Sequence, residues 1–183
     1  MRQAVPHPVW IGHAGDGRDF ARLHEAGIRA VVQLAVEEPA ILLPRELLHF
    51  RVPISDGAGN RADHLALAIR TVAELLSRRI PALVCCGAGM SRSPCIVAAA
   101  LAITTGEPPE ACLDTAAGRG PRDVSSSLWR DVSALVATWR STPGRQERAR
   151  DPGLASVAAR LPASKAAPIG SFALIPARAR GKL

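Results

Sequence analysis

The stretch that most constrains the fold of this chain runs from residue 83 to residue 93 and reads LVCCGAGMSRS. A short apolar run ends at Cys86, a Gly-containing loop follows, and Arg92 and Ser93 open an Ala-rich apolar segment. This order predicts a buried strand, a tight loop and the first turn of a helix. Such a loop turns backbone N–H groups toward one point, and the helix N-terminus adds free N–H groups and a partial positive charge. We therefore expect an anion-binding site between the strand and the helix.

The residue types in this loop indicate a phosphoryl group and a sulfur nucleophile. Glycine allows backbone conformations and close approaches to a ligand that other residues do not. The planar guanidinium of Arg92 can donate to two phosphate oxygens at once. The same positive field favours the thiolate form of Cys86 over the thiol. The predicted phosphate-binding residues are Gly87, Ala88, Gly89, Met90, Ser91 and Arg92.

These residues resemble the signature of the dual-specificity protein phosphatases, within the cysteine-based protein tyrosine phosphatase superfamily. That signature has His-Cys, two residues, Gly, two residues, Arg, and then Ser or Thr. This chain fits the signature at Cys86, Gly89, Arg92 and Ser93. It departs at position 85, where the family has His and this chain has Cys. The resemblance covers about residues 8–140, and the structural alternative is a buried Cys followed by a helix-capping turn.

The resemblance implies a catalytic role for each matching residue. Cys86 would attack phosphorus, while Arg92 and the loop backbone would hold the phosphate oxygens. Ser93 would donate a hydrogen bond to the departing thiolate, and capping of the helix is its structural alternative. The Cys85 substitution removes a His that supports the loop in the family.

A fourth group should protonate the leaving oxygen of the substrate. Asp56 lies in the Gly-rich segment SDGAGN after a predicted strand, and VPISD here resembles the family stretch that carries the general acid. Turn capping is the structural alternative for Asp56, since Asp often precedes Gly in turns. Asp63 is the competing carboxyl, but its position before an apolar helix predicts an N-cap.

Apolar runs and helical patterns alternate along the chain, which predicts an α/β fold with a central, mostly parallel sheet of four to five strands flanked by helices. We expect strands over residues 9–11, 29–35, 48–54 and 81–85. We expect helices that end near residue 26 and that cover residues 64–79, 94–105, 108–117 and 128–140. Ligands bind such sheets beyond the carboxyl ends of the strands, which is where Asp56 and Cys86 both fall.

Charge divides the chain into two parts. Residues 1–140 carry 15 basic against 14 acidic side chains, whereas residues 141–183 carry 8 against 2. We expect a catalytic domain over residues 1–142 and a basic tail over 143–183, whose Arg, Pro and Ala content predicts disorder. Such tails are more often solvated termini, and contact with nucleic acid, acidic lipid or another acidic partner is the alternative.

Neither a metal nor an organic cofactor is predicted. The five His are scattered, and no nucleotide-binding Gly pattern occurs. The four Cys fit free thiols in a reducing compartment better than disulfides or zinc ligands. No apolar run approaches the roughly 20 residues that span a membrane, and the first ten residues lack a signal-peptide segment. We expect a cytoplasmic monomer.

The resemblance implies an enzyme that hydrolyses phosphate monoesters through a phosphocysteine intermediate. Phosphotyrosine or phosphoserine/threonine proteins are the expected substrates. One alternative is a low-molecular-weight tyrosine phosphatase, because Cys, five residues and Arg-Ser-Pro also resemble its loop. That family places the loop at its N-terminus, unlike this chain. The other alternative is a non-catalytic phosphate-binding adaptor, or pseudophosphatase, which the absence of His before Cys86 favours.

Overall fold

A computed structural model of the chain describes residues 1–118 and 120–141. Its five-stranded sheet has the order β1-β2-β5-β3-β4. Neighbouring strands are parallel except for β1 and β2, which are antiparallel. The strands are β1 (Arg2–Gln3), β2 (Val9–His13), β3 (Ala30–Ala35), β4 (Leu48–Ile54) and β5 (Ala82–Cys86). The predicted mostly parallel α/β sheet is therefore confirmed. The expected domain boundary near residue 142 and the tail at 143–183 lie outside the described residues.

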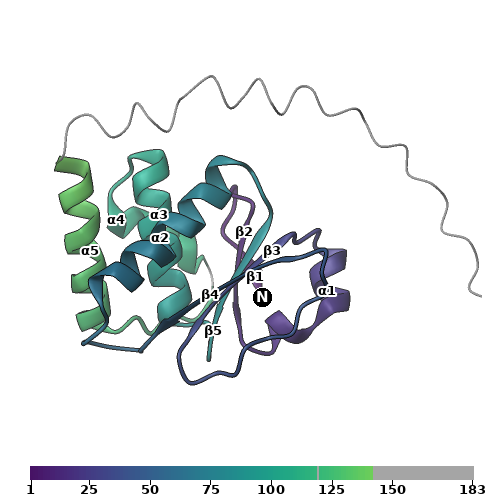
Figure 1. Ribbon diagram of the computed structural model, residues 1–183. Helices are drawn as coiled ribbons and strands as arrows, with labels where there is room; N and C mark the ends of the chain where they lie inside the picture. The colour runs from purple at the N-terminus through teal and green to yellow at the C-terminus, as the bar shows by residue number, and fades with distance from the viewer. Residues whose placement is uncertain (119, 142–183) are drawn as a thin grey trace, which may run out of the picture. The chain divides into compact units, whose positions relative to one another are not determined.

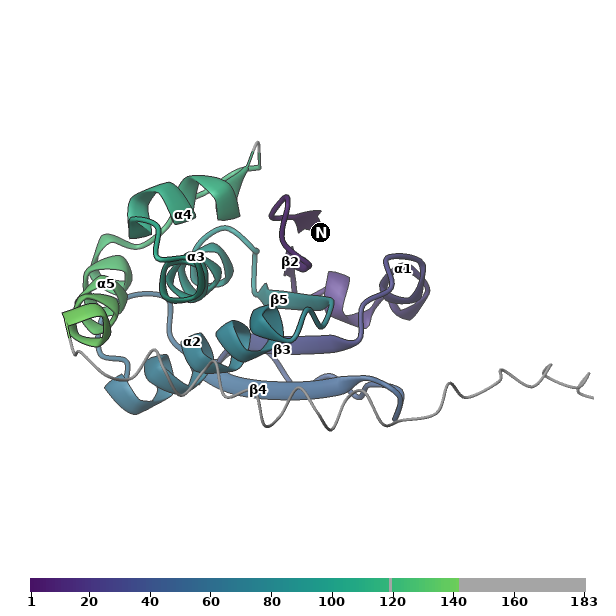
Figure 2. The same ribbon diagram turned by 90° about the horizontal axis from the view of Figure 1, so that it is seen from above.

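Helices cover both faces of this sheet. Figures 1 and 2 show α1 on one face and α2, α3, α4 and α5 on the other. The helical segments are the 3-10 turn η1 (Asp16–Arg18), α1 (Phe20–Glu25), α2 (Ala62–Ser77), α3 (Arg92–Thr105), α4 (Pro109–Ala117) and α5 (Ser126–Ser141). Within residues 1–118 and 120–141, no helix has the length and apolar character needed to cross a membrane.

Side chains along β5 alternate between two apolar cores, as the period of a strand requires. Val84 and Cys86 lie in the larger core, which the sheet forms with α2, α3, α4 and α5. Leu83 and Cys85 lie in the smaller core with Leu23 of α1. The two consecutive cysteines therefore sit on opposite faces of the sheet.

Helix α3 is the interior helix of the larger core. Every residue from Arg92 to Ala102 is buried, and the helix packs against the sheet and against α2, α4 and α5. An apolar surface on all sides is typical of a helix enclosed by other elements. The helix ends at Gly106, which adopts the left-handed conformation with φ of 81° that favours glycine at this position.

The prediction that Asp63 caps α2 is wrong. The N-cap is Arg61, and Asp63 falls in the first turn of the helix. Its carboxylate accepts hydrogen bonds from the Arg61 guanidinium at 2.6 and 3.0 Å. These bonds lower the pKa of Asp63 to about 2. An acidic side chain in the first turn still complements the helix dipole, which explains why it favours this end of α2.

Candidate active site

The predicted phosphate-binding loop joins β5 to α3. Cys86 is the last residue of β5, and Arg92 is the first residue of α3. Gly89 has φ of 73°, and a Cβ on it would lie 2.7 Å from the carbonyl oxygen of Gly12 in β2. Both the backbone conformation and the contact with the neighbouring strand therefore require glycine at position 89.

Backbone hydrogen bonds hold the loop from two sides. The amide of Ala14, just after β2, donates to the carbonyl oxygen of Gly87 at 3.2 Å. The amide of Asp123, in the connection between α4 and α5, donates to the carbonyl oxygen of Met90 at 3.0 Å. Ala88, between these two anchors, is exposed. Hydrogen bonds thus anchor the loop at Gly87 and Met90, and the loop is open to solvent at Ala88 between them.

The guanidinium of Arg92 forms a two-point ion pair with Glu37. Nη1 donates to Oε2 at 2.6 Å and Nη2 to Oε1 at 2.5 Å, while Nη1 also donates to the carbonyl oxygen of Ile54 at 3.1 Å. Arg92 is only 4% exposed. Burial acts against its positive charge, but the hydrogen bonds to Glu37 together with the attraction to Cys86, Glu37 and Asp56 outweigh this effect, so the pKa of Arg92 is raised. The same hydrogen bonds lower the pKa of Glu37.

Ser91 connects the loop to the carboxyl group predicted as general acid. Its hydroxyl donates to Oδ1 of Asp56 at 2.6 Å and accepts from the amide of Ser125 at 3.2 Å. Asp56 follows β4, and Ser125 immediately precedes α5. The fold therefore brings Asp56 against the phosphate-binding loop, whereas Asp63 is paired with Arg61 in the first turn of α2.

Two buried polar atoms at the start of α3 have no hydrogen-bond partner. They are Nε of Arg92 and Oγ of Ser93, and in the described residues the same holds only for Oγ of Ser133. A buried polar group without a partner costs about 1–3 kcal/mol, so such groups call for an explanation. Both atoms can donate a hydrogen bond, which is the requirement for binding an anion beside the loop.

A family model described as a polymorphic toxin system DSP-PTPase phosphatase matches residues 10–107. The chain belongs to this phosphatase family. The predicted relationship to the dual-specificity phosphatases is thereby confirmed. A search of curated proteins finds no match.

Solved structures of two DUSP proteins and of a tyrosine phosphatase-like protein share the fold of this family member. Human DUSP28 has a TM-score of 0.69 at 19% identity, over 77% of this chain and 99% of DUSP28. DUSP15 has a TM-score of 0.68 at 20% identity, over 82% of this chain and 96% of its own. The human tyrosine phosphatase-like serine/threonine/tyrosine-interacting protein has a TM-score of 0.66 at 16% identity, over 77% of this chain and 98% of its own.

Cys85 stands where the dual-specificity signature has His. Its side chain lies on the face of the sheet opposite to that of Cys86. Its side chain is fully buried in the smaller core, and its sulfur would lie 3.3 Å from a Cβ placed on Gly17. Burial raises the pKa of the Cys85 thiol to about 12. Cys85 therefore remains a neutral thiol that packs against apolar neighbours.

Sequence reasoning missed Glu37. The segment from residue 37 to 48 carries two prolines and has no clear helical or strand period, so it indicated no function. One signal was available: Glu37 lies just beyond the carboxyl end of the fully buried strand β3, separated from it by Val36, as Ser55 separates Asp56 from β4. The rule that ligands bind beyond the carboxyl ends of parallel strands applies to it equally.

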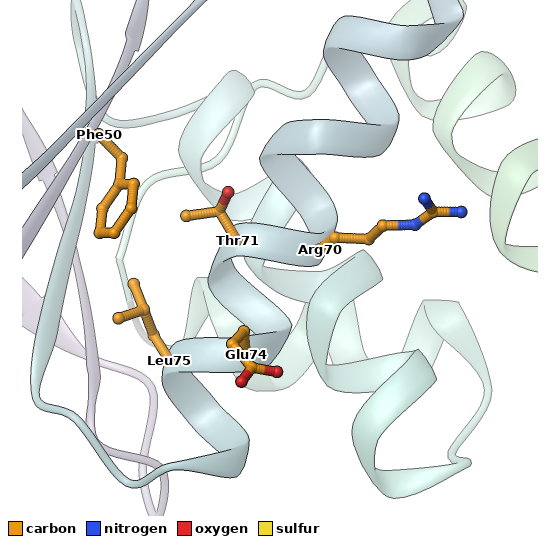
Figure 3. A pocket seen from close by; sticks show the side chains of 5 residues that line it. All are labelled: Phe50, Arg70, Thr71, Glu74 and Leu75. Carbon is orange, nitrogen blue, oxygen red and sulfur yellow. The ribbon is translucent and has the colours of Figure 1, made fainter. Parts of the chain in front are cut away.

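A separate hollow between β4 and α2 carries none of this chemistry. Phe50, Arg70, Thr71, Glu74 and Leu75 line it, and Figure 3 shows Arg70 directed away from Phe50 and Leu75. The Arg70 guanidinium carbon instead lies 4.8 Å from the centroid of the Trp139 ring. Across the part of the chain that the structure describes, no group of His, Cys, Asp and Glu is arranged to hold a metal ion.

Proposed function

We propose that the chain hydrolyses phosphate monoesters through a phosphocysteine intermediate on Cys86. The observation that carries this proposal is the pair of unpartnered buried donors, Arg92 Nε and Ser93 Oγ, at the junction of the loop and α3. A phosphoryl group supplies the acceptors that these donors lack. Glu37 and the carbonyl of Ile54 accept both Nη1 protons and one Nη2 proton of Arg92, so Nε–H and the second Nη2–H are the donors that remain for substrate oxygens.

In the first step the Cys86 thiolate attacks phosphorus, a sulfur–phosphorus bond forms, and the bond from phosphorus to the leaving oxygen breaks. Loop N–H groups and Arg92 stabilise the charge on the equatorial oxygens. Asp56 gives its proton to the leaving oxygen. Its Oδ1 accepts from Ser91, which leaves Oδ2 as the atom that carries this proton.

In the second step water attacks phosphorus and the sulfur–phosphorus bond breaks. The Asp56 carboxylate accepts a proton from that water, which restores the acid for the next cycle. Ser93 donates a hydrogen bond to the departing thiolate of Cys86. The products are inorganic phosphate and the free enzyme, and no metal takes part in either step.

We propose phosphotyrosine or phosphoserine/threonine proteins as substrates. The loop residues 87–91 contain no Lys or Arg, which disfavours highly charged inositol phosphates relative to a phosphorylated side chain. Phosphate release from matched phosphotyrosine and phosphoserine peptides and from a phosphoinositide would rank these classes. Faster release from the phosphoinositide would overturn this assignment of substrate.

The direct test is turnover of p-nitrophenyl phosphate in a buffer that contains a metal chelator. Wild type should be active and inhibited by vanadate, and Cys86→Ser should lose turnover. Cys85→Ser is the matched control, because the same change one residue earlier falls on the opposite face of the sheet. Turnover that survives Cys86→Ser refutes the mechanism, and an inactive folded wild type favours the phosphate-binding adaptor.

A further inference from the structure

The positive charge of Arg92 is offset in part by a carboxylate. Arg92 donates through both Nη atoms to Glu37, although it also interacts electrostatically with Cys86. Cys85 cannot replace the missing charge, because it is a neutral thiol in the other core. A positive charge from another part of the molecule would therefore add to the field that the loop N–H groups and the N-terminus of α3 supply at Cys86.

The register of the sheet places Arg2 on the required face. Arg2 lies directly opposite Ile11 in the antiparallel pair β1 and β2, so the two side chains share a face. Ile11 is in turn opposite Val84 in the parallel pair β2 and β5. Ile11, Val84 and Cys86 all belong to the larger core. The Arg2 side chain thus emerges on the same face of the sheet as the nucleophile.

The contacts of Arg2 join the loop to the end of α4. Nε donates to the carbonyl oxygen of Ala117 at 3.0 Å, and Nη2 lies 3.4 Å from those of Gly89 and Pro121. A Cβ on Gly120 would lie 2.6 Å from the guanidinium, which shows how closely the connection after α4 covers it. Arg2 therefore braces the glycine at which the loop turns.

The acceptors around Arg2 are neutral. All three of its hydrogen-bond partners are backbone carbonyls, and within residues 1–118 and 120–141 it forms no ion pair. Burial lowers the pKa of Arg2, and attraction to Cys86 acts in the opposite direction. In contrast to Arg92, Arg2 has no carboxylate partner in the described part of the chain.

We propose that Arg2 is a positioning residue of this phosphatase site, whose guanidinium holds the loop at Gly89 and whose positive charge acts on the nucleophile Cys86. Its relevance to turnover rests on the proposed function. The guanidinium acts through the nucleophile and the loop, and it does not contact the substrate.

The test measures the rate at which iodoacetamide alkylates Cys86 as a function of pH, by mass spectrometry of the peptide that contains it. Only the thiolate reacts, so the midpoint of the profile reports ionisation without any need for turnover. Loss of one partly buried charge should raise this midpoint by about 0.5–1 pH unit in Arg2→Gln. Arg2→Met should give the same shift, and Arg2→Lys should restore most of the wild-type midpoint.

Arg78→Gln is the control, because it removes one Arg, paired with Glu74, at the C-terminal end of α2, which precedes the start of β5, whereas the loop follows the end of β5. Its midpoint should equal that of wild type.

An unchanged midpoint in either folded charge-free variant, Arg2→Gln or Arg2→Met, overturns the proposal, as does a raised KM with an unchanged midpoint. A shifted alkylation profile in a protein without phosphatase activity would support the role of Arg2 and reject the proposed function. Normal turnover of the wild type together with an unshifted alkylation profile in the Arg2 variants would support the proposed function and reject the role of Arg2.

Discussion

Replacement of Glu37 by Gln would isolate the contribution of the ion pair that orients Arg92. The Glu37 carboxylate accepts from both Nη atoms of Arg92. A glutamine offers one acceptor oxygen, while its NH₂ group would face an Nη donor. The Arg92 guanidinium would then lose one charge-assisted hydrogen bond and the two-point contact that holds its plane. The direction in which the Nε–H bond points would no longer be fixed.

The exposure of the two partners decides the size of the effect on stability. Arg92 is buried, but the Glu37 side chain is 52% exposed. The cost should therefore lie between the value for a surface pair, below about 1 kcal/mol, and the roughly 3–5 kcal/mol of a fully buried pair. We expect a loss of about 1–2 kcal/mol, or about 3–6 °C in Tm for a domain of this size. Because Nε remains present but is less well aimed, kcat/KM should fall about tenfold, less than the roughly 10²–10³ for a donor removed outright.

The assays are thermal unfolding and p-nitrophenyl phosphate turnover, with Glu38→Gln as the control. Glu38 pairs with Arg18 at 2.8 Å, so this variant removes the same charge one residue away from the Arg92 contact. If kcat/KM of Glu37→Gln equals that of Glu38→Gln, the orienting role of Glu37 is refuted.

Acid pH gives an independent check of the same ion pair. Arg92 lowers the pKa of Glu37 below its ordinary value of 4.5, so the pair stabilises the fold above that pH. The contribution is lost as the pH falls through the lowered value in the folded state. The Tm difference between wild type and Glu37→Gln should therefore be largest near neutrality and shrink in acid. A difference that stays constant down to about pH 2 would contradict the assigned ion pair.

Three further changes test other parts of the site. Arg92→Lys should reduce kcat by about 10²–10³, because an ammonium cannot supply the planar arrangement of donors; near-normal kcat would reject the loop geometry. Asp56→Asn should flatten the alkaline limb of the kcat/KM profile and slow alkyl phosphates more than p-nitrophenyl phosphate, whose leaving oxygen needs little protonation; equal losses on both substrates would argue against Asp56 as the acid. Cys85→His should lower the free energy of unfolding by about 1–3 kcal/mol without raising kcat, because the larger ring overpacks the small core beside Gly17; a stable, faster variant would contradict this packing account.

The elements around the loop could be predicted from sequence because their signals are local. The apolar run of β5, the glycines of the loop and the arginine that opens α3 are consecutive, so their order alone indicates strand, loop and helix. Asp56 was found by the same reasoning at the end of β4. The assignment of Asp63 as N-cap was wrong because the helix begins two residues earlier than its apolar pattern suggested, at Ala62.

The contacts that Glu37 and Arg2 make at the loop could not be predicted in this way, although the position of Glu37 just beyond β3 was a local signal. Glu37 and Arg92 are 55 positions apart, and Arg2 and Gly89 are 87 apart. Their contacts depend on the strand order and on the antiparallel strand β1, a two-residue element too short to have a period. Non-local register, and not residue type, decides which charges meet at the loop.

The complete burial of α3 from Arg92 to Ala102 also affects how phosphatases of this kind can diverge. A helix enclosed on every side has no solvent face on which substitutions are neutral, so changes in this segment alter the packing and, with it, the proposed site. New substrate preferences must then arise in the connections that border the loop, residues 37–47, 55–60 and 120–125. The helix itself would be inherited almost unchanged, while the sequence of these three connections is free to vary.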